Sequence, residues 1–284
     1  MSDLTTKQHW DRVWSAKSAA VAPQSTSPFK RVVRRVFGPG LLTLKEAYNN
    51  RHLWRQWYPS CLPRGSGRSI IEIGSAPGLR LMEFHARLGY EPFGVEYSDT
   101  GADVNRRLFR AHGLPENNVI HADFFGQAFQ DKYRDGFDIV LSWSFLEHCA
   151  NPIDAVNKHA AILKPGGTLI VMIPNLKGVY GPLVRFFQPE WLKIHNYEIM
   201  NRDRYAALFR PTGLEELHCD YHGLFSFQKL QATPGSPKRH LLSILHKAQL
   251  GLNVLFNLLF RRHGPENAVF SQELLYIGRK PARG

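Results

Sequence analysis

From residue 69 onward, short apolar runs alternate along the chain with longer segments whose apolar residues recur at helical spacing. The apolar runs are rich in β-branched residues and lack a polar face, which is typical of strands buried on both sides. Five strands are expected, at 69–74, 91–98, 117–123, 136–143 and 167–175. Helices are expected between them, at 79–89, 100–113 and 151–167. This alternation predicts an α/β fold in which right-handed crossovers build a doubly wound, mostly parallel sheet.

The pattern loosens after residue 175, where glycine, proline and aromatic residues crowd the segment 176–200. A helix is expected next at 201–213, followed by a sixth strand at 214–223 and a last strand at 272–281. The stretch 224–270 between these two strands is an insertion. We expect the two variable segments, 176–200 and 224–270, to shape the substrate site.

Two helical patterns, at 1–20 and 42–58, precede the first strand, and a linker at 21–28 separates them. Trp10 and Trp14 lie four positions apart and therefore share one helical face. They either close a lid over a ligand or pack the helix against the domain. The predicted organisation is thus a helical lid and linker over residues 1–62, followed by one α/β domain over 63–284.

A helix is also expected at 239–263, directly before the last strand. Of the 20 residues from 241 to 260, 13 are apolar, and many recur at helical spacing, at 241, 244, 245, 248, 252, 255, 256 and 259. Polar side chains interrupt the segment, which argues against a membrane-spanning helix. We expect a cap over an apolar acceptor pocket; contact with another subunit and a peripheral position on a membrane surface stay open.

Composition narrows the picture only a little. The formal net charge is +12, but the basic residues are scattered and no aromatic-and-basic repeat accompanies them, so charge alone specifies no nucleic-acid partner. The three cysteines have no metal-ligand spacing and cannot all pair, which favours free thiols in a reducing compartment. The N-terminus lacks the apolar core of a signal peptide. We therefore expect a cytoplasmic protein of undetermined oligomeric state.

Candidate chemistry is concentrated where the first three strands end. The turn from Gly74 to Gly78 links a strand to a helix, so backbone can approach a ligand at a helix N-terminus. Glu96 ends the next strand, where a carboxylate can accept hydrogen bonds from both hydroxyls of a ribose. Asp123 follows the third strand and can accept from an adenine amino group. Together these residues predict a site for an adenosine-type ligand.

The same turn disfavours a dinucleotide. The fingerprint G-x-G-x-x-G needs glycine at its third and sixth places, where this chain has Ala76 and Leu79. Pro77 also removes one backbone N–H donor. A pyrophosphate-binding site is therefore disfavoured, although a nucleotide-dependent reductase remains an alternative.

The chain resembles the class I S-adenosylmethionine-dependent methyltransferases over about residues 66–220. The likeness is carried by the strand-end Glu96 and by the stretches "EIGSAPG", "HADFF", "DIVLSWSFLEHCANP" and "LKPGGTLIVMIPN". It implies a Rossmann-like sheet of seven strands, with the last strand antiparallel and inserted beside the fifth. It also implies that the cofactor is S-adenosylmethionine.

The resemblance further implies which residues contact this cofactor. In the family, the glycine turn wraps the methionine end, a strand-end acid holds the ribose, an acid and an apolar residue bracket the adenine, and the turn after the fourth strand lies beneath. The residues at matching positions are Glu72, Gly74, Ser75, Ala76, Gly78, Glu96, Tyr97, Asp123, Phe124, Ser142, Trp143 and Ser144. Ala76 departs from the glycine of many members, but it is small enough to leave the loop intact.

The acceptor is less clearly indicated. The sequence "SWSFLEHCANP" stands where 2′-hydroxyl RNA methyltransferases usually carry a second aspartate motif. It resembles small-molecule methyltransferases instead, including the ubiquinone-biosynthesis-like and sugar-modifying groups. We therefore expect O-methylation of an apolar or ring-bearing metabolite, sugar or lipid, with nucleic acid disfavoured. An RNA methyltransferase and a catalytically inactive cofactor-binding protein remain alternatives.

An alcohol acceptor needs a general base, and histidine is the usual choice near neutral pH. His148, after the fourth strand, and His195, in the variable segment, are the candidates; Glu147 could orient either one. A purely structural role stays open for each. The aromatic residues Tyr180, Trp191 and Tyr197 are expected to contact the substrate, although they could equally be core. No metal-ligand constellation stands out in the sequence, and no metal is expected.

Overall fold

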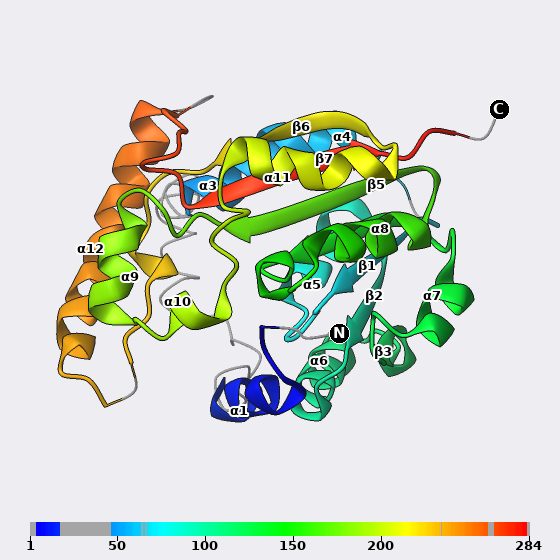
Figure 1. Cartoon of the computed structure of the whole chain (residues 1–284), viewed down its shortest axis with the longest axis horizontal. Coiled ribbons are helices and arrows are strands. Elements are labelled where there is room, and N and C mark those ends of the chain that lie inside the picture. Colours follow the sequence, from blue (N-terminus) through cyan, green and yellow to red (C-terminus); the bar gives the residue numbers. More distant parts are fainter. Residues whose placement is uncertain are drawn as a thin grey trace, which may run out of the picture.

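The computed structural model describes residues 4–17, 47–63, 65, 67–233, 235–260 and 264–282. Within these ranges, a twisted sheet crosses the molecule and helices lie against both of its faces (Figure 1). The expected linker at 21–28, the first residues of the helix expected at 42–58, and residues 261–263 lie outside the described residues.

The sheet has seven strands in the order β3-β2-β1-β4-β5-β7-β6. The first five in this order pair in parallel, and β7 is antiparallel to both of its neighbours. The predicted seven-stranded sheet, with an antiparallel last strand inserted beside the fifth, is therefore confirmed. The strand bounds are β1 (Ser69–Ile73), β2 (Glu91–Glu96), β3 (Val119–His121), β4 (Phe137–Trp143), β5 (Leu163–Pro174), β6 (Glu215–His222) and β7 (Glu273–Arg279).

Each face of the sheet carries its own apolar core, because successive strand residues point to opposite sides. Ile71 and Ile73 of β1 belong to one core, and Ile70 belongs to the other. Residues of α7 (Gln127–Tyr133), α8 (Pro152–Ile162), α9 (Tyr180–Phe187) and α11 (Arg202–Phe209) fill the first core. Residues of α4 (Tyr58–Cys61), α5 (Leu79–Leu88) and α6 (Asp99–Ala111) fill the second. This is the doubly wound arrangement that the sequence predicts.

Two local expectations between residues 124 and 167 are wrong or incomplete. The helix expected at 151–167 ends at Ile162, and β5 begins at Leu163, which pairs with Phe137 of β4. Lys164 also reaches back to Asp138 of β4, with an Nζ–Oδ2 distance of 2.8 Å, so the chain is already attached to the sheet there. The short helix α7 was not expected from the sequence.

The N-terminal helices are shorter than expected. The helix expected at 1–20 is α1 (Lys7–Lys17). The one expected at 42–58 consists, from residue 48, of α3 (Tyr48–His52), a π-helical segment (Leu53–Trp57) and α4. Figure 1 shows α1 apart from α3 and α4, at the opposite end of the molecule from the β6 edge.

The inserted helix is α12 (Lys238–Leu259), and it packs with a face that the sequence did not predict. None of the eight apolar positions that recur at helical spacing is buried. The buried side chains are instead Leu242, Gln249, Asn253 and Asn257. The polar ones find partners in the fold: Gln249 Oε1 accepts from the Phe227 N–H at 2.8 Å, and Gln249 Nε2 donates to Asn253 Oδ1 at 3.0 Å. Several leucines of α12 therefore point to solvent.

No helix among the described residues is both long and apolar enough to cross a lipid bilayer.

Candidate active site

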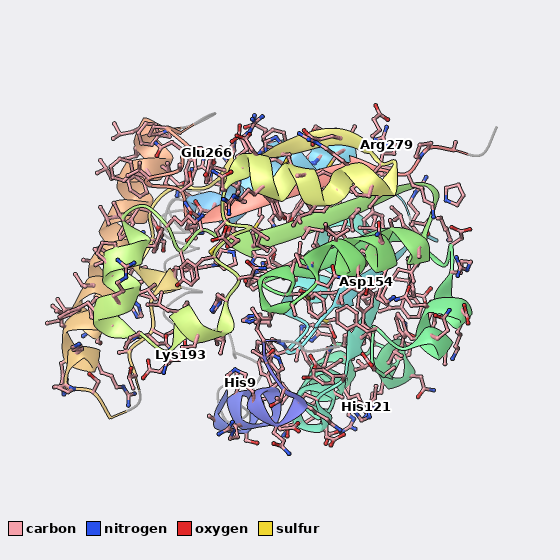
Figure 2. All side chains as sticks on the ribbon, viewed as in Figure 1. His9, His121, Asp154, Lys193, Glu266 and Arg279 are labelled. Carbon is pink, nitrogen blue, oxygen red and sulfur yellow. The ribbon has the colours of Figure 1, made fainter. Side chains whose placement is uncertain are left out.

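A large cleft opens at the carboxyl ends of β1, β2 and β4 and extends to the segments after β5 and β6. Its volume of about 1270 Å³ exceeds the roughly 300–1,000 Å³ of a site for one small molecule. The cleft can therefore hold two reactants side by side. Figure 2 labels two of its lining residues, His9 on α1 and Lys193 on α10 (Trp191–Ile194).

The glycine turn after β1 is held against β2. The backbone N–H groups of Gly74 and Ser75 both donate to the Val95 carbonyl, at 3.0 and 3.2 Å. Gly78 has φ +95° and begins α5, and a Cβ there would lie 2.3 Å from Asn105 Oδ1. Only glycine meets both constraints, so the turn requires glycine here; the approach of its backbone to a ligand stays a prediction.

Glu96 lies at the end of β2 with 6% of its surface exposed. Its Oε1 accepts from the Ser98 N–H at 3.1 Å, and its Oε2 accepts from the Ala76 N–H at 3.4 Å. Burial raises the pKa of this carboxyl. Each oxygen can accept a second hydrogen bond, so a diol in the cleft can bridge the two.

Glu72 of β1 forms the floor near the glycine turn, and Arg80 of α5 lies beside it. The Arg80 guanidinium packs over the Trp143 ring, 3.0 Å from its centroid, and its Nε is 4.0 Å from Glu72 Oε1. Glu72 Oε2 is buried and has no hydrogen-bond partner among the described residues. Burial raises the pKa of Glu72 to about 8. Arg80 was not identified from the sequence, because nothing in the helix pattern distinguishes it from a solvent-facing arginine.

The residues expected beside an adenine also line the cleft. Asp123 is exposed, and its Oδ1 accepts from the Phe125 N–H at 2.9 Å. Phe124 is buried against Phe145, with ring centroids 5.8 Å apart. Asp123, Phe124 and Tyr97 thus line the cleft, and their contact with an adenine stays a prediction.

The three serines expected at the cofactor differ in their positions. Ser142 does not line the cleft: its side chain is fully buried within the sheet, between β1 and β5. The Ser75 hydroxyl accepts from Asn105 Nδ2 beneath the turn, so it supports the loop from inside. Ser144 lines the cleft, with φ +55°, a backbone conformation that side chains rarely adopt. The prediction for Ser142 is thus wrong in its geometry.

The other end of the cleft carries Glu147, His148 and His195. His148 Nδ1 donates to the Ile194 carbonyl and His195 Nδ1 donates to the Trp191 carbonyl, each at 2.7 Å. Because a carbonyl only accepts, Nε2 of each neutral ring keeps its lone pair. The centroids of the two imidazole rings are 4.6 Å apart, and His148 Nε2 is 3.9 Å from Glu147 Oε1. Burial lowers the pKa of His148 to about 3 and that of His195 to about 4, so both rings are neutral at physiological pH.

This group also has the donor set of a metal site. The ligand atoms of the three residues lie within 4.8 Å of one another. Sequence spacing alone could not reveal this, since His195 comes from the segment after β5 and joins the other two only in the fold. The group is therefore able either to accept a proton or to hold a divalent cation.

Of the three aromatic residues expected to contact the substrate, only Trp191 lines the cleft. Tyr180 is fully buried, and its hydroxyl accepts from the Ser226 N–H at 2.7 Å. Tyr197 packs against the core instead. The predictions for Tyr180 and Tyr197 are therefore wrong: both belong to the wall behind the cleft. The variable segments contribute residues that the sequence did not indicate, including Lys229, whose Nζ is 3.1 Å from Glu273 Oε1.

Helix α1 lies along the cleft. Trp10 packs edge-on against His148, with centroids 5.1 Å apart. Trp14 lies near Glu96, since a Cβ on Gly101 would contact both the Trp14 ring, at 2.9 Å, and the Glu96 carboxyl, at 3.0 Å. Trp10 and Trp14 are one helical turn apart, so α1 contacts the histidine group with one tryptophan and the region of Glu96 with the other. The lid alternative for Trp10 and Trp14 agrees with this position.

A family model described as "Methyltransferase domain" matches residues 47–218, which is more than half of the chain. Among curated relatives, the ubiquinone biosynthesis O-methyltransferase of Alkalilimnicola ehrlichii is 34% identical over 116 residues, covering 40% of this chain and 45% of the relative. The matched region spans less than half of the length of the first curated relatives.

Solved structures share the fold at low identity. The phosphoethanolamine N-methyltransferase 2 of Haemonchus contortus, in complex with S-adenosyl-L-methionine, has a TM-score of 0.51 at 14% identity, covering 92% of this chain and 61% of that chain. The cyclase SpnF has a TM-score of 0.56 at 14% identity, covering 98% of both chains. At this identity, the likeness shows the fold alone, and this fold serves more than one reaction.

The raised pKa of Glu72 predicts a pH-dependent stability. Its carboxyl stays protonated in the fold up to about pH 8, whereas in the unfolded chain it ionises from its ordinary value of 4.5. Between these values the unfolded state binds fewer protons, so the stability of the wild type falls as the pH rises through this window. Glu72→Gln lacks this loss of stability. The difference in Tm, variant minus wild type, should therefore increase by about 5 °C between pH 5 and pH 8.5.

Scanning calorimetry across this pH range measures the difference. Glu215→Gln, which replaces an exposed acid on β6, is the control and should follow the wild type throughout. A constant Tm difference between Glu72→Gln and wild type would contradict the raised pKa.

Proposed function

Because this chain belongs to the class I S-adenosylmethionine-dependent methyltransferases, we propose that it methylates an oxygen atom of a small, apolar or ring-bearing molecule. The enzyme's cofactor supplies an electrophilic methyl group on a sulfonium. The observation that carries the proposal is the pair of neutral histidines at one end of the cleft, whose Nε2 lone pairs are placed to accept a hydrogen bond from a hydroxyl group.

The residues of the cleft fit the cofactor. Glu96 presents two carboxylate oxygens for the ribose hydroxyls, and the glycine turn leaves room for a ligand against the backbone. At the methionine end, Glu72 Oε2 is an unsatisfied acceptor suited to an ammonium group. Arg80, held over Trp143, is suited to a carboxylate. Asp123 and Phe124 bracket the adenine in this arrangement.

The acceptor lies between the glycine turn and the histidines. A Cβ on Gly74 would be 3.0 Å from the Phe145 ring, so the turn directly adjoins the segment that leads to Glu147 and His148. A hydroxyl in this gap is close to both the methyl donor and the Nε2 atoms. Positioning of this kind accounts for much of the rate in a displacement reaction. We assign His148 and His195 to accept the hydroxyl proton. Glu147 lies 3.9 Å from His148 Nε2, but burial raises the pKa of its carboxyl to about 8, so we assign it to orienting the ring rather than to supplying charge.

The surroundings favour an acceptor with an apolar body. Trp10 and Trp191 flank the histidines, and Phe125 and Phe145 line the adjoining wall. Curated relatives of this chain include ubiquinone biosynthesis O-methyltransferases. A phenol with an apolar substituent fits both the aromatic lining and a histidine base.

An apolar acceptor also gives a role to the outward face of α12. Ile244 is 63% exposed and Leu258 is 49% exposed, and exposed Arg239 and Lys247 belong to the same helix. An amphipathic helix with leucines and basic residues outside binds anionic lipid headgroups. We assign this face to peripheral contact with an anionic membrane, from which the acceptor is drawn.

Loss of the ribose-binding acid should weaken cofactor binding. Glu96→Gln keeps the side-chain volume but replaces charged acceptors, so the Kd for S-adenosylmethionine should rise by about 10- to 100-fold in calorimetric titration. Glu116→Gln, on the exposed surface, should leave the Kd unchanged, and NADH should bind none of these proteins. An unchanged Kd in Glu96→Gln would show that the ribose lies elsewhere.

Loss of either histidine should slow transfer without affecting cofactor binding. We expect His148→Gln and His195→Gln to lower the rate of S-adenosylhomocysteine formation on alkyl-substituted catechols by about 10²- to 10⁴-fold. His112→Gln, which replaces an exposed histidine after α6, is the control. If dialysis against EDTA abolished the reaction, a metal ion and not a histidine base would activate the hydroxyl group. Transfer to amines but not to phenols would overturn the proposed O-methylation.

Charges on the outward face of α12 should abolish membrane contact. Wild type should co-sediment with vesicles that contain anionic lipid, and the double variant Ile244→Glu, Leu258→Glu should remain in the supernatant. The charge-matched control Asn117→Glu, Gln127→Glu, at exposed sites near β3, should sediment like wild type. Equal sedimentation of both double variants would refute a role for α12.

A further inference from the structure

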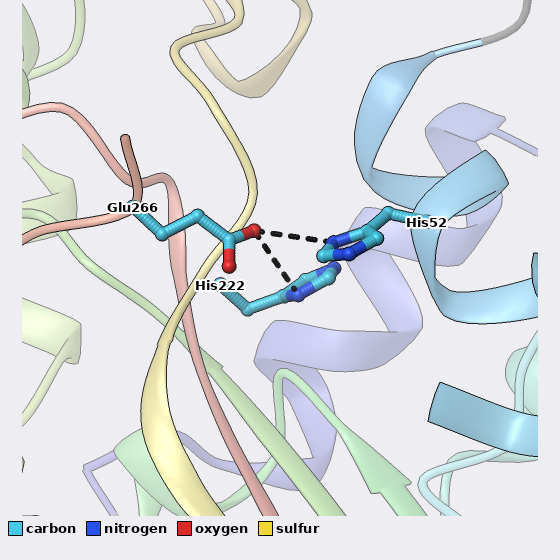
Figure 3. A group of neighbouring side chains, drawn as sticks. All are labelled: His52, His222 and Glu266. Atoms are coloured by element: carbon cyan, nitrogen blue, oxygen red, sulfur yellow. Dashed lines mark ion pairs between the residues drawn. The ribbon is translucent and has the colours of Figure 1, made fainter. Parts of the chain in front are cut away.

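Three residues from distant parts of the chain meet at the β6 edge of the molecule. His52 comes from α3, His222 is the last residue of β6, and Glu266 lies in the loop that leads to β7. Figure 3 shows both imidazoles directed at the same carboxylate oxygen. None of the three lines the active-site cleft, and Figure 2 shows Glu266 away from the labelled cleft residues His9 and Lys193. The group is therefore separate from the site described above.

The two nitrogen–oxygen distances agree with those of ligands around a shared ion, and all three ligand atoms lie within 4.8 Å of one another. Glu266 Oε1 is 3.4 Å from His52 Nδ1 and 3.6 Å from His222 Nδ1. These separations are longer than an N–H···O hydrogen bond, whose usual limit is about 3.2 Å. They agree with the edge of a tetrahedron whose corners lie about 2.0–2.1 Å from a central zinc ion, which is roughly 3.3–3.4 Å.

The remaining ring nitrogens are occupied as in metal-bound histidines. His222 Nε2 faces the Asn49 carbonyl at 3.3 Å and must donate to it, so Nδ1 of the neutral ring carries a lone pair toward Glu266. His52 Nε2 faces the side-chain oxygen of Gln56. Both histidines thus direct Nδ1 at an anionic oxygen, an arrangement that needs a positive charge between them. A second hydrogen bond that fixes the tautomer is typical of metal ligands.

The surrounding structure holds the three donors in place. The Gly223 N–H donates to Glu266 Oε1 at 2.7 Å and fixes the carboxylate. A Cβ on Gly223 would lie 2.3 Å from Asn49 Cγ, so this position requires glycine. Asn49 Oδ1 in turn accepts from the Leu224 N–H at 2.7 Å. His222 is fully buried, while 17% of the Glu266 side chain is exposed and leaves a path for an ion.

We propose that His52, His222 and Glu266 bind a divalent transition-metal ion of the zinc type, with water as the fourth ligand. Two imidazoles and one carboxylate suit zinc better than magnesium or calcium, which prefer oxygen donors. The ion ties α3 to the end of β6 and to the loop before β7. Since Asn49 of α3 also lines the active-site cleft, the ion supports one wall of the site from behind.

Zinc binding by the full-length protein tests the proposal, after dialysis against a chelator and titration in competition with a chromogenic zinc indicator. Because the cleft group of Glu147, His148 and His195 could also bind zinc, the double variant His148→Gln, His195→Gln serves as the matched control. Glu266→Gln removes the charge but keeps an oxygen that can accept from Gly223. We expect wild type and the control both to bind one zinc equivalent at this site. Its affinity should fall more than about 100-fold in Glu266→Gln, beyond the usual cost of losing a residue that only hydrogen-bonds to a ligand.

Two further measurements guard against a folding defect. His52→Gln, in a different segment, should lose the same zinc equivalent, and both variants should keep the circular dichroism and S-adenosylmethionine affinity of wild type. Cobalt bound to wild type should give the strong visible absorption of a tetrahedral site, and this absorption should be absent in Glu266→Gln. Unchanged zinc affinity in Glu266→Gln, or no zinc binding by wild type below millimolar concentration, would overturn the proposal and leave a proton shared between the carboxylate and the histidines.

Discussion

The active-site cleft depends on one topological constraint: β1 and β4 lie side by side, but the chain leaves them toward opposite faces of the sheet. The segment after β1 leads to α5 on one face, and the segment after β4 leads to α8 on the other. The two segments must separate at the carboxyl end of the sheet, and a gap opens between them. The glycine turn and the Glu147–His148 turn are the two walls of this gap, so their chemistry is brought together by strand order.

Sequence patterns predict this arrangement well where the spacing of apolar residues fits one kind of secondary structure. The strands of the parallel sheet are continuous apolar runs, and their ends place the glycine turn, Glu96 and Asp123 at one edge. The pattern is less informative where a local signal competes with tertiary contacts. Residues 163–167 follow a helical stretch, but pairing with Phe137 draws Leu163 into β5. For α12, spacing predicts a helix but not which side is buried; a ladder of amide hydrogen bonds makes the polar side the inner one.

The site is predictable to a similar extent. Glu72 and Glu96 near the ends of strands, and the glycines after β1, line the cleft as their positions predict. Ser142 lies one residue too early to reach the cleft and remains inside the sheet. Tyr180 and Tyr197 resemble ligand contacts by composition, but they fill the core. The meeting of His148 with His195, and of His52 with His222 and Glu266, depends on segments that only the folded sheet brings together. Sequence spacing carries no signal for either group.

The contact between α1 and α6 links ligand binding at Glu96 to the docking of α1. Asp11 of α1 accepts from the Ser98 hydroxyl at 2.7 Å and from the Thr100 N–H at 3.1 Å, while the Ser98 N–H is the donor that holds Glu96 Oε1. The first turn of α6 is thus shared between the covering helix and the acid at the end of β2. If ligand binding at Glu96 changes the equilibrium constant for docking of α1, then docking of α1 must change the affinity for the ligand by the same factor, because linkage between two sites is reciprocal. A helix joined in this way senses whatever binds at Glu96 through the first turn of α6.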